Sequence, residues 1–213
     1  MKKTYLYHLS IIVSIFLTAF LLARQSHAYM TVNETAELLP ENYYKLGLAP
    51  QLIISDGGGF NMGAFADVHV TQDIDGRISL GGGETDFWTQ VSAKWVPFPD
   101  VDKQPAMGAR AAIIYARDES LNAVGFQIAP IISKKADTQY GNMIPYVSLP
   151  VTWFSTKQKS YVTSQFTLGA EWFPLEDKHI GAEFNLNLDN TFSSFSVYFS
   201  FPFEGSTGYK RYE

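Results

Sequence analysis

The stretch Thr191–Phe203, which reads TFSSFSVYFSFPF, decides the fold. From Phe195 to Phe203 an apolar side chain occupies every second position, and Ser194, Ser196 and Ser200 lie between them. Successive side chains of a strand point to opposite faces, so this pattern predicts a strand with one large apolar face and one small, mostly polar face. Lipid outside and a polar lumen inside would favour it, so we expect this strand to close a transmembrane β-barrel.

The first 28 residues have the features of a secretory signal peptide. Lys2 and Lys3 precede the apolar run Ile11–Ala23, and Ser26–Ala28 forms a small-x-small cleavage site. An uncleaved membrane anchor is the alternative, but the apolar run is shorter than the ~20 residues that a spanning helix needs. We therefore expect residues 1–28 to be removed on export.

The composition of the rest of the chain narrows the class of protein. Three of the 16 basic residues and none of the 21 acidic ones lie in residues 1–28, so cleavage leaves a net charge of −8. An acidic chain argues against nucleic acid as a partner. There is no cysteine, hence no disulfide and no thiolate metal site, and no cofactor is expected. Two classes remain: a soluble periplasmic β-protein and an outer-membrane barrel.

Residues 29–43 lack a clean period and are expected to form a lead-in segment. Turn residues then recur at short intervals and separate ten expected strands, which makes an antiparallel up-and-down meander. Gly81–Gly83 weakens the third strand, and eight strands is the alternative count. The ten ranges are Tyr44–Ile54, Phe60–Thr71, Asp75–Gly83, Asp86–Phe98, Ala106–Arg117, Leu121–Lys134, Asn142–Phe154, Ser160–Leu175, Lys178–Leu188 and Thr191–Phe203.

Strand length and face composition favour the membrane barrel, which we place at residues 44–203, followed by a tail at 204–213. Most expected strands have eleven residues or more, whereas a membrane-crossing strand needs ~9–11 and globular strands usually have ~5–6. Their polar faces are mostly Ser, Thr, Asn, Gln and Gly. A soluble barrel that binds an apolar ligand would turn its bulky face inward and carry many charges outside.

Aromatic residues near the strand ends are expected to form girdles at the two membrane interfaces. An even number of strands places both termini on the periplasmic side. The girdle residues that we expect are Trp88, Trp95, Trp153, Trp172, Phe201 and Phe203.

Alternation also places charged side chains on the lumen face. Lys94 and Arg110 lie on the fourth and fifth strands, and Glu171 and Glu183 lie on the eighth and ninth, nearly across the ring. A charge in a narrow lumen must be paired or hydrated. The sequence therefore predicts a lumen network of Lys94 and Arg110 with Glu171 and Glu183, joined by Asp67, which either braces the barrel or selects small polar solutes.

No catalytic or metal site is predicted. His69 shares a strand face with Asp67, which would suit an outer-membrane lipid-modifying enzyme, but it lies near the periplasmic end without a serine in a recognisable context. His179 is expected to face solvent beside a turn. Two remote histidines do not form a metal site.

Short motifs also show a resemblance to a known set of proteins. The motifs are KWVPFPD at 94–100, QPAxGxRA at 104–111, YAR at 115–117 and PYxSLP at 145–150. Over roughly residues 44–203 the chain resembles small, largely uncharacterised outer-membrane β-barrel proteins of Gram-negative bacteria. The resemblance implies a fold and a location but no reaction. The expected partners are outer-membrane lipid and lipopolysaccharide, with the barrel assembly machinery and periplasmic chaperones during biogenesis.

Overall fold

The computed structural model describes residues 31–55, 58–118, 121–139, 141–175 and 178–205 of the 213-residue chain. The predicted signal peptide and residues 206–213 of the predicted tail lie outside this part. Within the described residues no helix is long and apolar enough to span a membrane.

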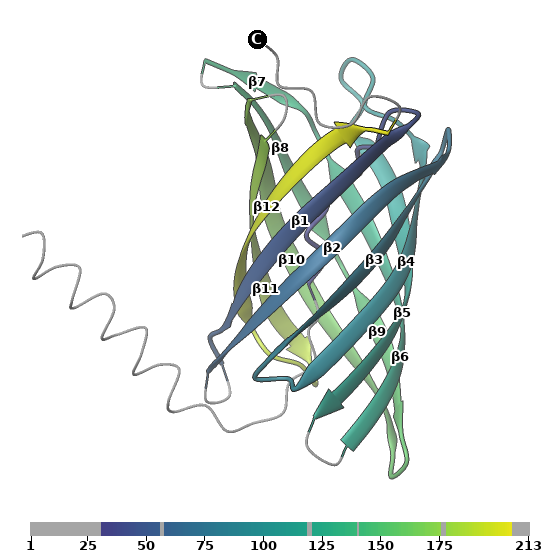
Figure 1. Ribbon diagram of the computed structural model, residues 1–213, viewed down its shortest axis with the longest axis vertical. Coiled ribbons are helices and arrows are strands. Elements are labelled where there is room, and N and C mark those ends of the chain that lie inside the picture. Colours follow the sequence, from purple (N-terminus) through teal and green to yellow (C-terminus); the bar gives the residue numbers. More distant parts are fainter. Residues whose placement is uncertain (1–30, 56–57, 119–120, 140, 176–177, 206–213) are drawn as a thin grey trace, which may run out of the picture.

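Twelve strands in the described part form one closed antiparallel sheet (Figure 1). Their bounds are β1 Tyr43–Ile53, β2 Gly59–Thr71, β3 Ile74–Gly83, β4 Phe87–Phe98, β5 Ala106–Asp118, β6 Leu121–Ser133, β7 Ala136–Thr138, β8 Gly141–Ser148, β9 Val151–Thr156, β10 Ser160–Leu175, β11 Lys178–Asp189 and β12 Ser194–Glu204. Each wall strand pairs with its neighbours along the chain, which is the topology of an up-and-down barrel.

The barrel wall has ten strand positions, because β8 and β9 follow one another along the same position between β6 and β10. The pairs Ile131–Ser148 and Ile128–Val151 with β6 keep the same register on both sides of the gap. The gap falls at Leu149–Pro150, where proline has no N–H to give to the ladder. The short strand β7 pairs only with β8 and extends that hairpin beyond the wall.

The closing strand and the glycine-rich third strand are both found in the wall. β12 pairs with β11 on one side and with β1 on the other, for example Phe199 with Leu48. β3 pairs with β2 and β4 through Gly81, so the ten-strand prediction is confirmed and the eight-strand alternative is wrong. β12 begins at Ser194 rather than at Thr191, because the residues before it form the turn from β11.

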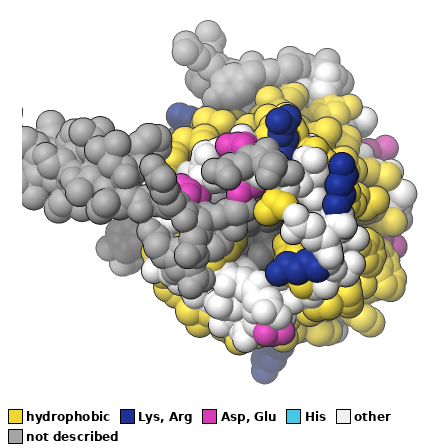
Figure 2. Space-filling view, turned by 90° about the horizontal axis from the view of Figure 1, so that it is seen from below, with side chains coloured by type: hydrophobic (Ala, Val, Ile, Leu, Met, Phe, Trp, Pro, Cys, Tyr) yellow, Lys and Arg dark blue, Asp and Glu magenta, His cyan; other side chains and the backbone are white. Residues whose placement is uncertain are grey.

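The two faces of the wall are opposite to those of a soluble barrel. Aliphatic and aromatic side chains lie outside; Ile113 is 63% exposed and Leu48 is 52% exposed. Polar side chains lie inside, and Gln51 and Asn185 are fully buried. Figure 2 views the barrel along its length, from the end opposite the C-terminus, and shows hydrophobic side chains around its outer edge. Because an apolar belt of this extent requires lipid, the barrel is a transmembrane one and the soluble alternative is wrong.

Aromatic rings inside the wall lie directly over glycines of neighbouring strands. A Cβ added at Gly125 on β6 would lie 2.6 Å from Cε1 of Phe154 on β9. Phe154 packs with Ile114 and Phe192 in an apolar cluster inside the barrel. The glycine therefore makes room for a ring that joins two strands across the sheet.

Candidate functional site in the barrel lumen

Residues 31–36 lie inside the lumen, and residues 37–42 lead from there to the start of β1 in the wall. Residues 31–36 are all buried, and none of them is more than 4% exposed. The segment belongs to no strand, and Figure 1 shows it in purple behind the wall. We call residues 31–42 the plug segment. Its backbone cannot use the ladder of the sheet, so its polar groups must find other partners.

Glu183 on β11 holds the start of the plug segment. Its two carboxylate oxygens accept hydrogen bonds from the backbone N–H groups of Val32 at 2.9 Å and Asn33 at 2.5 Å. Tyr146 Oη and Asn185 Nδ2 also donate to this carboxylate, at 2.8 and 2.9 Å. Hydrogen bonds to a carboxylate are shorter and stronger than those to a neutral acceptor, so Glu183 is a strong anchor for this backbone.

Two arginines hold the carbonyl groups of the same residues. Arg77 Nη1 donates to the carbonyl oxygens of Val32 and Asn33, both at 3.1 Å. Arg110 donates to the carbonyl of Val32 at 3.1 Å and to that of Thr31 at 3.3 Å. The barrel wall thus replaces the strand partner that this stretch of backbone lacks.

Glu34 is the central acid of the plug segment. Its carboxylate lies 3.5 Å from Arg110, 3.7 Å from Lys94 and 3.9 Å from Arg77, on three different strands. Lys94 also donates to the carbonyl oxygens of Thr35 and Glu37. Glu34 is buried among three cations, so it holds the segment to β3, β4 and β5 together.

A second set of ion pairs lies beside the first. Arg77 forms a bidentate ion pair with Asp67, in which Nε donates to Oδ1 at 2.6 Å and Nη2 donates to Oδ2 at 2.8 Å. Lys45 lies 3.3 Å from Asp67 and 3.8 Å from Glu171, and Glu171 is 3.1 Å from Nδ1 of His179. Together with Glu34 and its three cations, these pairs form a ring of charged side chains around the lumen, which we call the charged belt. Its members are Glu34, Lys94, Arg110, Arg77, Asp67, Lys45, Glu171 and His179.

The five residues of the predicted network all face the lumen, but their partners differ from those predicted. Lys94 and Arg110 pair with Glu34 rather than with Glu171 or Glu183. The plug segment occupies the space between the two sides of the ring. The direct pairing that alternation suggested is therefore wrong, and Asp67 pairs with strands next to its own.

Sequence reasoning also left out Glu34, Arg77 and Lys45. Lys45 and Arg77 fall on the inward positions of their expected strands, so alternation could have found them. Glu34 belongs to a stretch with no period, so no pattern could have placed it in the lumen.

The aromatic residues predicted for the girdles separate into two groups. Trp95, Trp153 and Phe201 are exposed on the outer face, and Trp172 and Phe203 are half-buried. Trp88 is 1% exposed and points into the lumen, so its place in the girdle is wrong. Its neighbour Phe87 faces outward, which turns Trp88 inward, over Gly81 on β3.

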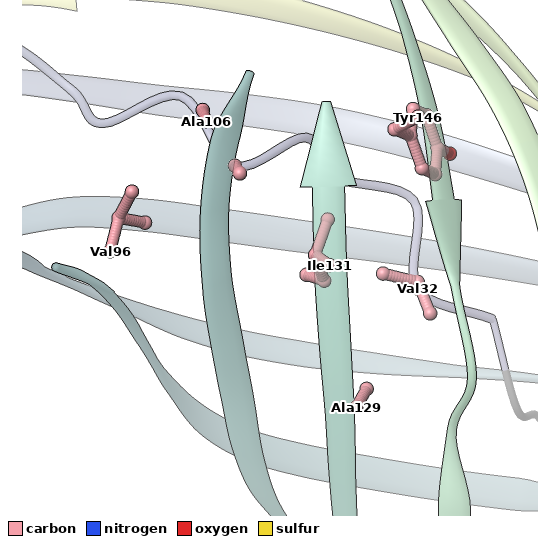
Figure 3. Packing of buried hydrophobic residues seen from close by; sticks show 7 residues of the cluster. Val32, Val96, Ala106, Ala129, Ile131 and Tyr146 are labelled. Carbon is pink, nitrogen blue, oxygen red and sulfur yellow. The ribbon is translucent and has the colours of Figure 1, made fainter. Parts of the chain in front are cut away.

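Apolar contacts complete the seat of the plug segment. Val32 and Ala36 pack against Val96, Ala106, Ala129, Ile131 and Tyr146 inside the barrel (Figure 3). Beside Thr31 and Val32 the remaining space is about 10 Å³, roughly enough for one water molecule. The lumen is therefore nearly filled at this level.

The other part of the lumen combines the apolar cluster around Phe154 with uncharged polar side chains. Gln51 donates to Ser194 at 3.0 Å, and Asn61 donates to Gln51 at 3.2 Å. Gln127 donates to Thr152 at 2.9 Å. These amides and hydroxyls bond mainly to one another, so this part of the lumen contributes polar but no charged side chains around its apolar cluster.

The two histidines have local partners. His69 lies 3.7 Å from Asp75, and no serine contact accompanies it. His179 is 12% exposed, contacts Glu171 and lies 4.0 Å from the ring centre of Phe173, so the expectation that it faces solvent is wrong. The described residues contain no group of three or more His, Asp or Glu that could hold a metal ion.

Comparisons with known proteins identify relatives of the fold only. No protein-family model matches the chain, and no curated protein matches it by sequence. Among solved structures, the β domain of the Bordetella autotransporter BrkA matches with a TM-score of 0.48 and 11% identity, over 76% of this chain and 98% of that one.

Two further structures match in the same range. An outer membrane channel from Pseudomonas putida has a TM-score of 0.46 and 9% identity, over 83% of this chain and 100% of that one. The N-terminal barrel domain of Pseudomonas aeruginosa OprF has a TM-score of 0.38 and 11% identity, over 76% and 98%. The chain is thus similar to transmembrane β-barrels, at identities that carry no function across.

Proposed function

We propose that this chain is an outer-membrane β-barrel of a Gram-negative bacterium, with a narrow lumen that the plug segment closes. The observation that carries the proposal is the seat of residues 31–36, which Glu183, Arg77, Arg110 and Lys94 hold inside a polar-lined barrel. The charged belt braces the barrel while the segment is in place. Small polar solutes pass slowly, when the segment leaves its seat.

The signal peptide that the sequence predicts supports this function. Cleavage after Ala28 would leave only Tyr29 and Met30 ahead of Thr31. A segment with a free end can withdraw from a lumen without breaking any wall strand. The proposal places both barrel termini in the periplasm and names outer-membrane lipid, lipopolysaccharide and the assembly machinery as partners. It assigns no catalytic residue.

The test is planar-bilayer conductance of the mature chain against a variant that lacks residues 29–38. The deletion removes Glu34 and the backbone that Glu183 holds, but leaves every wall strand in place. We expect small, rare openings for the mature chain and larger, longer ones for the variant. Arg110→Ala, which loosens the seat without shortening the chain, should show an intermediate effect.

Two measurements make the result decisive. Migration of unboiled protein on a gel, compared with boiled protein, shows that each variant is folded. Glu41→Gln is the matched control, because Glu41 lies in the plug segment with its side chain exposed. If the folded deletion variant conducts no better than the mature chain, the plug segment does not close a pore, and the barrel has a structural role only. Fractionation into the inner rather than the outer membrane would contradict the location.

A further inference from the structure

A cavity of about 190 Å³ lies where the plug segment meets β1, at the end of the barrel that carries both wall termini. Its walls come from residues of the plug segment and from β1, β2, β3, β4, β10, β11 and β12. An apolar cavity of ~150 Å³ can hold a molecule as large as benzene, so this one has room for a small organic solute.

Acidic groups outnumber basic ones on the lining of the cavity. Five carboxylates line it, from Glu34, Glu37, Asp67, Asp75 and Glu171, against three basic side chains, Lys45, Lys94 and His179. Lys45 is engaged by Asp67 and Glu171, and His179 also contacts Glu171. Lys94 is engaged by the plug segment and lies 3.6 Å from Asp75. Cations outside the lining, Arg77 and Arg110, neutralise Asp67 and Glu34.

Two carboxylate oxygens on this lining have no hydrogen-bond partner. Asp75 is 5% exposed, and its Oδ2 accepts from the N–H of Leu39 at 2.9 Å while its Oδ1 accepts none. Two cationic candidates lie beside this carboxylate, Lys94 Nζ at 3.6 Å from Oδ2 and His69 Nδ1 at 3.7 Å from Oδ1, and both are beyond hydrogen-bond distance. Glu37 Oε1 is likewise unpaired, and burial raises the pKa of Glu37.

The rest of the lining distinguishes an organic cation from a metal ion. Phe173, Tyr43, Leu38 and Leu39 supply aromatic and aliphatic surface next to the carboxylates. Hard metal ions take six or more oxygen ligands, whereas the described residues contain no group arranged to hold one. Aromatic faces with nearby carboxylates are the usual surroundings of an organic ammonium group.

We propose that this cavity binds a small primary-ammonium compound, whose N–H groups donate to Asp75 Oδ1 and Glu37 Oε1 and whose carbon chain packs against Phe173 and Tyr43. The ammonium group would satisfy both unpaired oxygens and offset the acidic excess of the lining. This site goes beyond the proposed function, since binding requires the plug segment in its seat but no conduction.

The test is a calorimetric titration of the folded mature chain in zwitterionic detergent at pH 7. The probes are n-butylammonium chloride, n-butanol of the same shape without charge, and MgCl₂. We expect saturable binding of n-butylammonium, no saturable heat with butanol, and no competition by Mg²⁺. Asp75→Asn should weaken n-butylammonium binding at least tenfold, because the substituted side chain loses its charge and keeps its shape.

Two further variants complete the test: one is a control, and the other tests the second carboxylate. Asp73→Asn lies two residues away in the exposed β2–β3 turn and should bind like the unsubstituted chain. Glu37→Gln, which changes a residue outside the wall strands, should weaken binding as Asp75→Asn does. Equal binding of butanol, Mg²⁺ competition that depends on Asp75, or binding unchanged in both acidic variants would each overturn the proposal.

Discussion

Replacing Glu34 with glutamine should loosen the plug segment without affecting the wall. The substitution keeps the volume of the side chain and removes the charge that faces Arg110, Lys94 and Arg77 at 3.5–3.9 Å. Removing one partner from a buried ion pair costs about 3–5 kcal/mol. Glutamine can still accept a hydrogen bond from one of the three cations, so we expect the lower value, about 3 kcal/mol.

Hydrogen exchange of the plug segment measures this loss. The amides of Val32 and Asn33 are protected by Glu183, so they exchange only when the segment leaves its seat. A loss of about 3 kcal/mol is roughly a hundredfold in the docking equilibrium, since 1.4 kcal/mol is tenfold. In Glu34→Gln these amides should therefore exchange roughly a hundredfold faster, while amides of the wall strands keep their rates.

Glu41→Gln is the control, because Glu41 is exposed in the same segment and should leave the exchange unchanged. If Glu34→Gln changes the exchange of Val32 and Asn33 by less than threefold, the carboxylate does not hold the segment. If the wall amides accelerate equally, the charges stabilise the barrel as a whole and the plug segment has no separate equilibrium.

Three further substitutions test particular contacts. Gly125→Ala places a Cβ 2.6 Å from Phe154, and overpacking of this kind should lower the free energy of unfolding in urea by about 1–3 kcal/mol. Asp100→Asn should lower the free energy of unfolding at neutral pH, because the hydrogen bond from Lys134 holds the pKa of Asp100 below its ordinary value; the difference should vanish as the pH falls through that lowered pKa. Glu37→Gln should slow exchange of the plug segment at pH 7, because burial raises the pKa of Glu37 and its charged form is disfavoured in the seat; the advantage should disappear below the ordinary carboxyl pKa.

Each of these predictions has a matched comparison. Gly76→Ala meets its nearest atoms only at 3.3 and 3.4 Å and should change the free energy of unfolding less than Gly125→Ala does. Asp102→Asn, in the same turn, leaves the Asp100 carboxylate that accepts from Lys134 in place and should lower the free energy of unfolding less than Asp100→Asn does. A Glu37→Gln effect that persists unchanged at pH 4 would contradict the role given to its charge.

The wall of the barrel was predictable because each strand alternates apolar and polar side chains, so every second residue indicates which face is which. In β12, Phe195, Phe199 and Phe201 face outward and Ser196 and Ser200 inward, as alternation requires. Strand length then distinguished a membrane barrel from a soluble one. Errors arose at strand ends, where the period stops. Trp88 lies near a strand end, where a girdle residue is expected, but its alternation with the outward-facing Phe87 turns it into the lumen.

The site was less predictable, because its centre has no period. Alternation placed Lys94 and Arg110 in the lumen, and burial of charge required partners for them. The partner that the structure provides, Glu34, lies in an irregular segment whose position depends on the shape of the finished lumen. Ring geometry alone suggested that opposite strands would pair directly, and it could not show that a segment of the same chain fills the space between.

The most direct test of the plugged lumen is the reactivity of a single cysteine at position 36, since the chain has no cysteine of its own. Ala36 is 1% exposed, packed against Ile131 and Tyr146, whereas Glu41 in the same segment is exposed. In the folded mature barrel, a membrane-impermeant maleimide should modify Glu41→Cys quickly and leave Ala36→Cys unmodified until the sample is boiled. Equal modification of both cysteines in a folded, heat-modifiable barrel would show that residues 31–36 do not occupy the lumen.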